Sequence, residues 1–354
     1  MPDAPATQHP LPRRTQRPHL AALLEDRWCA VAGAFLRRRG WVPRLLPYTG
    51  YGTPLGVRVL ARVLLVPPSH ATGPLAPELA AERRPLRSYL TMPAPGEPVR
   101  VTVGGADVTV KTDRAGYVDA LVSPPEDAPL PAGRHDVVLT AERSGAEATG
   151  QVVVVGPGTT FGVVSDIDDT AMITAVPRPL VAAWNTFVIR ASARRPVPGM
   201  PELYRRLAAD HPGAPFVYLS NGAWNTAGTL SQFLDRYGFP PGPLLLTDWG
   251  PTQTGWFRSG PQHKSDTLDR LMTTFPDVRW LLLGDAGQLD EDVYVRASAR
   301  WQGRVVAIAI RKVARARVRP VRGRPEPGAP LVRGEDGVEL ADRLAWLLRP
   351  DSTR

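Results

Sequence analysis

The 354-residue sequence contains a single cysteine, Cys29, which excludes a disulfide within the chain and a cluster of cysteine metal ligands. It also contains no uncharged apolar run near the length of about 18 residues that a membrane-spanning helix requires. The N-terminal stretch MPDAPATQHPLPRRTQRPHL is rich in proline and arginine and has no apolar core, so we expect no secretory signal there. These absences favour a cytoplasmic protein and leave peripheral contact with a membrane open.

Lysine is also scarce: among 43 basic residues only Lys111, Lys264 and Lys312 are lysines. The formal net charge of +9 suggests an acidic partner, such as a phosphorylated substrate, an anionic membrane surface or a nucleic acid. We attribute most of this charge to a general preference for arginine, which makes each remaining lysine more informative. No basic motif is interleaved with aromatic residues, so nucleic-acid binding is not expected.

The first part of the chain divides into three segments. Residues 1–17 are expected to be a disordered tail, and apolar residues at helical spacing predict an amphipathic helix at 18–40 that packs on its own protein. Residues 41–157 contain short alternating runs separated by proline and glycine, which predicts a small β-sandwich domain. Its strands are expected near 57–63, 99–103, 108–111, 116–122, 135–142 and 149–155.

After residue 157 the pattern changes to strands that alternate with helices. Residues 158–312 predict an α/β domain with a doubly wound parallel sheet, whose ligands bind at the carboxyl ends of the strands. Residues 313–354 are expected to be a basic linker followed by a C-terminal helix near 337–348. Strands are expected at 161–165, 215–219, 243–247, 279–283 and 303–310, and helices at 178–192, 200–209, 224–237, 264–274 and 290–299.

The most informative stretch is FGVVSDIDDTAMIT at residues 161–174. A short apolar strand ends in Asp166, Asp168 and Asp169, whose mutual repulsion does not stabilise any fold. Convergent carboxylates on a rigid strand are what a hard divalent cation requires. We therefore expect a metal site at the end of this strand rather than a solvated acidic turn.

Three later segments carry polar groups at positions that the same fold would bring together. A second strand ends in Ser220 and is followed by Asn221, at the start of a helix, where a hydroxyl and backbone amides can bind an anion. Lys264 opens a later helix, and a fully apolar strand ends in Asp285, with Asp290 five residues further on. Each segment alone is typical of a turn or a solvated charge. Their order at successive element ends indicates one site.

Together these groups are suited to phosphoryl transfer. Asp166 can attack phosphorus and form an aspartyl-phosphate, while Asp168 can protonate the leaving alcohol and later deprotonate the hydrolytic water. Ser220 and Lys264 can hold the phosphate oxygens as their charge shifts. Mg²⁺ bound through Asp166, Asp285 and a backbone carbonyl at position 168 would reduce repulsion between the nucleophile and the phosphate.

Four segments in order, SDIDDT, YLSNGAW, HK and LLGDAGQLDED, resemble the motifs of the haloacid dehalogenase (HAD) phosphatase superfamily. More narrowly, they resemble the actin-patch-associated phosphatidate phosphatase family in its bacterial form. PYTGYGTPLGVRVLARVL at 47–64 and TDRAGYVDA at 112–120 look like the N-terminal β domain of that family. The resemblance covers about residues 40–312. Ala286 and the turn that ends in Trp224 depart from the family pattern near the phosphate pocket.

The resemblance implies a HAD-like fold and a Mg²⁺-dependent phosphatase that converts phosphatidate or related lipid phosphates to diacylglycerol and phosphate. It implies Asp166 as nucleophile, Asp168 as acid/base, Ser220, Asn221 and Lys264 as phosphate-binding residues, Asp166, Asp168 and Asp285 as metal ligands, and Asp169, Thr170 and Asp290 as supporting residues.

Two alternatives to a lipid phosphatase stay open. One keeps the chemistry and changes the substrate to a soluble phosphomonoester or a phosphoprotein. The other is a non-catalytic protein that binds anionic lipid through its basic surface, although the intact acidic cluster argues against it. Residues 171–200 are too few for a large cap domain. Their apolar positions and flanking arginines fit either a lipid-facing helix or a helix packed on the sheet.

Overall fold

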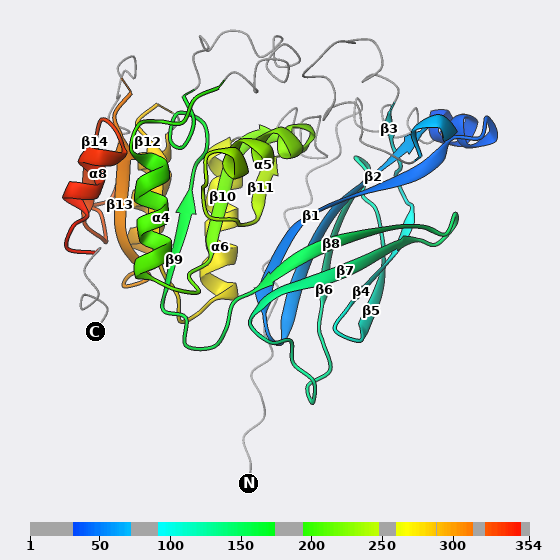
Figure 1. Cartoon of the computed structure of the whole chain (residues 1–354), viewed down its shortest axis with the longest axis horizontal. Coiled ribbons are helices and arrows are strands. Elements are labelled where there is room, and N and C mark those ends of the chain that lie inside the picture. Colours follow the sequence, from blue (N-terminus) through cyan, green and yellow to red (C-terminus); the bar gives the residue numbers. More distant parts are fainter. Residues whose placement is uncertain are drawn as a thin grey trace.

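The computed structural model describes residues 31–71, 91–173, 194–247, 260–287, 289–313 and 323–347. Within these residues the chain forms two β-sheets, one that ends before Gly158 and one that begins after it (Figure 1). The predicted tail at 1–17 and the predicted helix at 178–192 lie outside the described residues. Of the predicted helix at 18–40, residues 31–40 are described, and residues 31–38 are helical.

The first sheet has eight strands in the order β3-β2-β1-β8-β7-β4-β5, and β6 pairs with β2. The strands are β1 (Val42–Thr53), β2 (Gly56–Val66), β3 (Met92–Pro93), β4 (Pro98–Val103), β5 (Ala106–Lys111), β6 (Tyr117–Val122), β7 (Gly133–Ala141) and β8 (Ala146–Val154). The sequence analysis missed β1 because Pro43 and Pro47 argue against a central strand. The strand tolerates both prolines because its pairing with β8 covers only residues 50–52.

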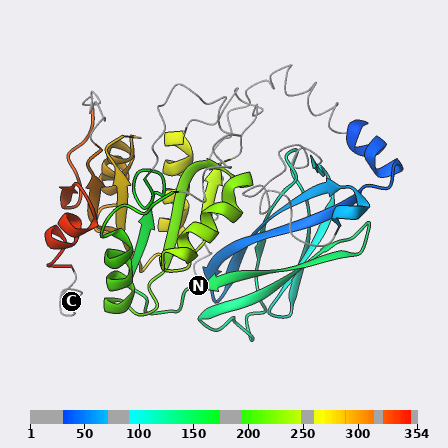
Figure 2. The ribbon, with the colours of Figure 1, turned by 45° about the horizontal axis from the view of Figure 1, so that its top comes forward.

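The first sheet surrounds a core of its own. Alternate residues of β2, β4, β6, β7 and β8 are buried in one apolar cluster, with Val59, Val101 and Leu139 among its members. Figure 2 shows the blue and green strands of this sheet lying across its teal strands. A sandwich of two separate sheets stays a prediction, because hydrogen bonds connect all eight strands into one sheet.

The second sheet has the order β11-β10-β9-β12-β13-β14, and each neighbouring pair is parallel. Its strands are β9 (Phe161–Ser165), β10 (Phe216–Ala223), β11 (Leu244–Thr247), β12 (Arg279–Asp285), β13 (Val305–Arg311) and β14 (Leu331–Gly334). The chain order reverses beside β9, since β10 lies on one side of it and β12 on the other. In open α/β sheets, ligands bind in the crevice outside the strand ends at such a reversal.

Helices cover both faces of the second sheet (Figure 1). The helices α4 (Met200–Asp210), α5 (Ala227–Arg236) and α8 (Gly337–Arg343) pack on one face, and α6 (Gly260–Thr274) and α7 (Asp290–Arg300) pack on the other. The mixed α/β class and the parallel sheet are therefore confirmed. Among the described residues, no helix combines the length and the apolar character needed to cross a bilayer.

The strand β14 was not predicted. It has only four residues, and it lies in the arginine- and proline-rich segment after residue 312 that we interpreted as a linker. The backbone of this segment pairs with β13, from Ile308 opposite Leu331 to Arg311 opposite Gly334. Composition therefore misled the prediction here, because a short edge strand needs little apolar sequence of its own.

The two sheets share part of one apolar core. Tyr51 of β1 and Leu60 of β2 are buried in the same cluster as Phe275 and Val278 of the second half. The ring centroids of Tyr51 and Phe275 lie 6.1 Å apart. The first sheet therefore packs directly on the domain that carries the predicted site.

Candidate active site

The carboxyl ends of β9, β10 and β12 carry most of the predicted site residues. Because β9 lies between β10 and β12, residues that follow these three strands meet at one edge of the sheet. The backbone N–H of Asp166, the first residue after β9, donates to the carbonyl of Leu283 in β12 at 2.9 Å. This bond fixes Asp166 against the strand that ends in Asp285.

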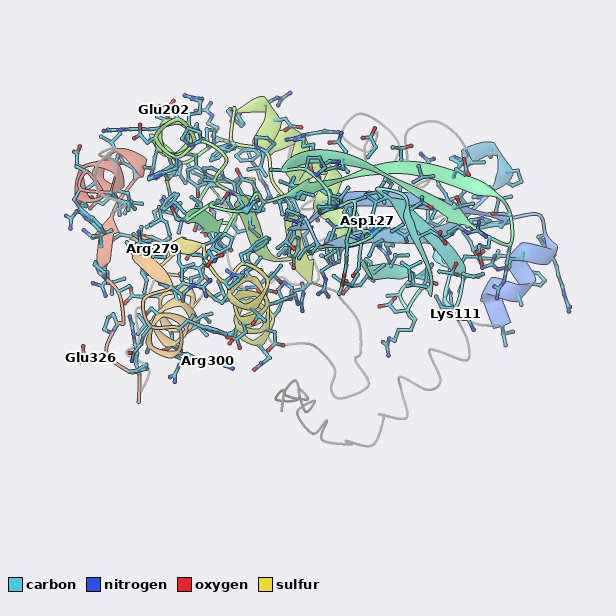
Figure 3. All side chains as sticks on the ribbon, turned by 90° about the horizontal axis from the view of Figure 1, so that it is seen from below. Lys111, Asp127, Glu202, Arg279, Arg300 and Glu326 are labelled. Carbon is cyan, nitrogen blue, oxygen red and sulfur yellow. The ribbon has the colours of Figure 1, made fainter. Side chains whose placement is uncertain are left out.

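Lys264 lies at the centre of the site. Its Nζ donates to Asp166 Oδ1 at 2.6 Å and to Asp290 Oδ1 at 2.5 Å, and all three side chains are shielded from solvent. Burial opposes the charge on Lys264, but the two carboxylates outweigh it and raise its pKa. Figure 3 shows Lys111 on the first sheet, apart from the second sheet. One of the few lysines of this sequence thus lies at the centre of the predicted site.

Burial also governs the protonation of the neighbouring carboxyl groups. It raises the pKa of Asp166 well above the usual range; Lys264 opposes this effect, and the charges of Asp290 and Asp285 add to it. Burial together with the charge of Asp290 raises the pKa of Asp285 to about 7. Burial raises the pKa of Asp290 as well. One buried cation therefore does not balance the three carboxyl groups around it.

The Gly284–Asp290 turn brings two of these carboxyl groups together. A side chain at Gly284 would place its Cβ 2.8 Å from the Asp290 Cβ, so only glycine permits this approach. Leu289 has a φ of 64°, the left-handed conformation, and directly precedes Asp290 at the start of α7. The Gly287 N–H donates to Asp285 Oδ1.

The residues present fit a divalent cation. Carboxylate oxygens of Asp166, Asp285 and Asp290 lie within 4.8 Å of one another. Asp166 Oδ2 and Asp285 Oδ2 are buried and have no hydrogen-bond partner in the part of the chain that the structure describes. Leaving such oxygens unpaired is costly, and a hard cation with oxygen ligands would satisfy both. The Asp168 carboxylate is not in this group, which leaves its backbone carbonyl as the expected contribution.

Asp168 instead lies toward solvent, with 15% of its side chain exposed. The Ser220 hydroxyl donates to Asp168 Oδ2 at 3.1 Å and accepts from the Gly222 N–H at 2.9 Å. Arg194 Nη1 lies 3.8 Å from Asp168 Oδ1. The structure therefore brings Asp168 and Ser220 together, and it adds an arginine that the sequence analysis named only within a group of flanking arginines.

Of the remaining predicted residues, Asp169 and Thr170 lie in the loop after β9, and Asn221 lies near the end of β10. Asp169 has a φ of 58°, and its carbonyl accepts from Arg311 Nη1 at 2.7 Å. Thr170 is buried, and its hydroxyl has no partner among the described residues. The carbonyl of Asn221 accepts from the Thr247 hydroxyl at 2.8 Å, and its side chain abuts Gly260 at the start of α6. The Asp169 and Asn221 bonds connect the ends of β9 and β10 to Arg311 of β13 and Thr247 of β11.

One buried contact beneath the site was not predicted. The Ser165 hydroxyl lies within hydrogen-bonding distance of the Tyr204 hydroxyl of α4, and Ser165 directly precedes Asp166. Burial raises the pKa of Tyr204, so its hydroxyl stays protonated. A serine at the end of an apolar strand gives no local sign of a partner 39 positions away.

Comparisons with known proteins show which family residues 161–312 resemble. Residues 161–312 match the family model described as "Phosphatidate phosphatase APP1, catalytic domain". The predicted resemblance to that family is therefore confirmed for these residues, which include every predicted site residue.

Two curated proteins match part of the chain. "Phosphatidate phosphatase APP1" of Saccharomyces cerevisiae is 28% identical over 152 residues, which cover 43% of this chain and 26% of the yeast protein. "Uncharacterized protein C29B5.04c" of Schizosaccharomyces pombe is 24% identical over 154 residues, with coverage of 43% and 25%. The chain thus spans about a quarter of the length of these relatives.

Two solved structures show weak likeness. The HAD domain of the effector Lem4 from Legionella pneumophila has a TM-score of 0.31 and 14% identity, and the match covers 43% of this chain and 85% of that one. The carbohydrate acetylesterase XAC1771 from Xanthomonas citri has a TM-score of 0.29 and 12% identity, with coverage of 86% and 74%.

Proposed function

We propose that this protein is a metal-dependent phosphatase with a HAD-like, doubly wound catalytic sheet, and that it releases phosphate from phosphatidate or a related lipid phosphate. The observation that carries the proposal is the buried contact of Lys264 with Asp166 and Asp290, beside Asp285, at adjacent strand ends. It lies within the segment that matches the phosphatidate phosphatase catalytic domain.

In this proposal Asp166 is the nucleophile. Its carboxylate oxygen attacks phosphorus, the bond from phosphorus to the alcohol oxygen breaks, and an aspartyl-phosphate forms. Lys264 holds Oδ1 of Asp166 and stays positively charged, because two carboxylates surround it. Mg²⁺ held by Asp166, Asp285 and the backbone carbonyl at 168 would supply the positive charge that lets an anionic nucleophile approach a phosphate.

Asp168 transfers the protons. It gives a proton to the departing alcohol oxygen, and it later takes one from the water whose oxygen attacks phosphorus and releases Asp166. Its partial exposure suits both steps, since the alcohol leaves toward solvent and the water enters from it. The Ser220 hydroxyl donates to the Asp168 carboxylate and can turn its one proton to a phosphate oxygen when the ester binds.

The test is phosphate release from detergent-dispersed phosphatidate, measured with Mg²⁺ and with EDTA, for wild type and Asp166→Asn. We expect metal-dependent release that falls by at least about 10³-fold in the variant, because no nucleophile remains. Asp127→Asn is the matched control, because Asp127 is exposed and lies on the first domain (Figure 3).

Comparing phosphatidate with an aryl phosphate as substrate distinguishes the alternative functions. Release from an aryl phosphate but not from dispersed phosphatidate would keep the mechanism and move the substrate to the soluble phosphomonoesters or phosphoproteins. Release from neither, together with binding of anionic vesicles, would replace the enzyme with a lipid-binding protein.

A further inference from the structure

Arg194 has a well-defined position beside the site. Its backbone runs antiparallel to the loop that follows Asp168, through a bridge between Met172 and Pro196 and a 3.0 Å bond from Ile173 N–H to the Arg195 carbonyl. On its other side, the Tyr237 hydroxyl donates to the Arg194 carbonyl at 3.1 Å. The backbone of Arg194 is therefore held over the Asp168 loop, and its guanidinium lies between Met172 Sδ, at 3.7 Å, and the Asp168 carboxylate.

Exposure indicates the side from which a substrate reaches the site. Asp166, Lys264, Asp285 and Asp290 are fully buried, whereas the side chains of Asp168 and Arg194 keep 15% and 14% of their exposure. Asp168 and Arg194 are thus more exposed than the four buried charged side chains of the site. The side of the site with Asp168 and Arg194 is therefore more exposed than the side with Lys264.

The charge balance favours a second cation. Lys264 already contacts two carboxylates at 2.5–2.6 Å, and a phosphomonoester brings up to about two further negative charges. Arg194 Nη1 lies 3.8 Å from Asp168 Oδ1, longer than a charged hydrogen bond of about 2.7–2.9 Å. The planar guanidinium matches two phosphate oxygens at once, which a single carboxylate oxygen at this distance does not.

We propose that Arg194 is a phosphate-binding residue of this site. When substrate arrives, its guanidinium turns from the Asp168 carboxylate to the phosphate oxygens on the solvent side. The exchange leaves Asp168 to transfer protons and adds positive charge opposite Lys264. This inference rests on the proposed phosphatase function and names a residue that determines its affinity for the phosphate group.

The experiment compares Arg194→Ala, Arg194→Lys and Arg195→Ala with wild type. Arg195 is the matched control, because it is the next residue, carries the same charge and is exposed. The first readout is the affinity for inorganic phosphate in the presence of Mg²⁺, measured by calorimetry. The second is KM and kcat for the ester that wild type hydrolyses.

We expect Arg194→Ala to weaken phosphate binding by about tenfold or more, since a charged double hydrogen bond is lost. Its KM should rise by a similar factor. The phosphate affinity and KM of Arg194→Lys should lie between those of Arg194→Ala and wild type, because a single ammonium charge replaces the two N–H groups of the planar guanidinium. Arg195→Ala should stay within about twofold of wild type.

Phosphate affinity in Arg194→Ala equal to wild type would overturn the inference, and so would an equal loss in Arg195→Ala. If Arg194→Ala fails to fold, Arg194→Gln, which keeps the length of the side chain, gives the same comparison. Wild type that hydrolyses no ester but loses phosphate binding on Arg194→Ala would refute the proposed function and uphold the phosphate site. Wild type that binds no phosphate would refute the site.

Discussion

The buried charged contacts of Lys264 are better explained by function than by stability. Its buried contacts with Asp166 and Asp290 bring three charged groups out of water, and replacing such a group by apolar residues is often neutral or stabilising. Packing therefore gives no reason to keep this arrangement. A reaction that needs a fixed cation beside a carboxylate nucleophile does give one.

The protonation of Asp285 is the first prediction at this scale. Its pKa in the folded protein, about 7, lies above the ordinary value, so its contribution to stability is present at low pH and is lost as the pH rises through about 7. We expect the free energy of unfolding in EDTA to fall between pH 5 and pH 8 in wild type, and to fall less in Asp285→Asn. Urea denaturation at four pH values measures the free energy of unfolding of both proteins.

Added Mg²⁺ should reverse this trend in wild type, because a cation binds the ionised carboxylate and its affinity therefore rises with pH. Parallel pH profiles for wild type and Asp285→Asn in EDTA would contradict the assignment of the shift to Asp285.

Among the elements, α7 connects the site to the C-terminal segment. Its first residue is Asp290, and the next, Glu291, accepts from Arg324 at 2.8 Å and from Arg333 at 2.6 and 3.1 Å. Arg333 belongs to β14, which lies beyond the residues that match the family model. The arginines hold the pKa of Glu291 below its usual range, against the effect of its burial. This contact fixes the edge of the sheet to the helix that carries a site residue.

Glu291→Gln tests this contact. We expect the free energy of unfolding at pH 7 to fall by about 1–3 kcal/mol, because charged hydrogen bonds are lost at a side chain that is only 10% exposed. The control is Glu202→Gln on α4, whose partner Arg205 forms an exposed i,i+3 pair, and it should change stability by less than about 0.5 kcal/mol. Equal effects in urea denaturation would show that the contact with α7 contributes nothing particular.

At the scale of the whole molecule, the first sheet directly contacts the turn that follows β10, the strand of Ser220. Trp224 follows Ser220 by four positions, and its ring centroid lies 4.4 Å from that of Tyr48 in β1 and 6.1 Å from that of Tyr117 in β6. Arg62 lies over the Tyr117 ring at 4.8 Å. The first sheet therefore supports the turn that ends the strand of Ser220.

Tyr48→Ala should lower kcat/KM by roughly threefold to tenfold, because aromatic pairs contribute about 0.5–1.5 kcal/mol and the turn loses its support. Tyr48→Phe keeps the ring and should behave like wild type. Steady-state kinetics on the ester that wild type hydrolyses provides the measurement. Unchanged kcat/KM in Tyr48→Ala would show that the two domains act independently.

Local patterns predicted much of this protein. The strand–helix alternation after residue 157 correctly located five of the strands of the second sheet, from β9 to β13, because apolar periodicity reports burial. The same pattern failed at β1, which contains prolines, and at β14, which is short and basic. In both cases the neighbouring strand, and not the residue itself, decides the conformation.

The sequence by itself determined that carboxylates, a hydroxyl and a lysine follow successive strand and helix boundaries, and hence that they meet at one edge of a sheet. Only the tertiary structure decided which atoms face one another. Lys264 contacts Asp166 across 98 positions and Asp290 across 26, and Arg194 meets Asp168 through a chain pairing that no local pattern shows. Periodicity is a property of neighbours in the chain, whereas the charge and hydrogen bonding of a site depend on neighbours in space.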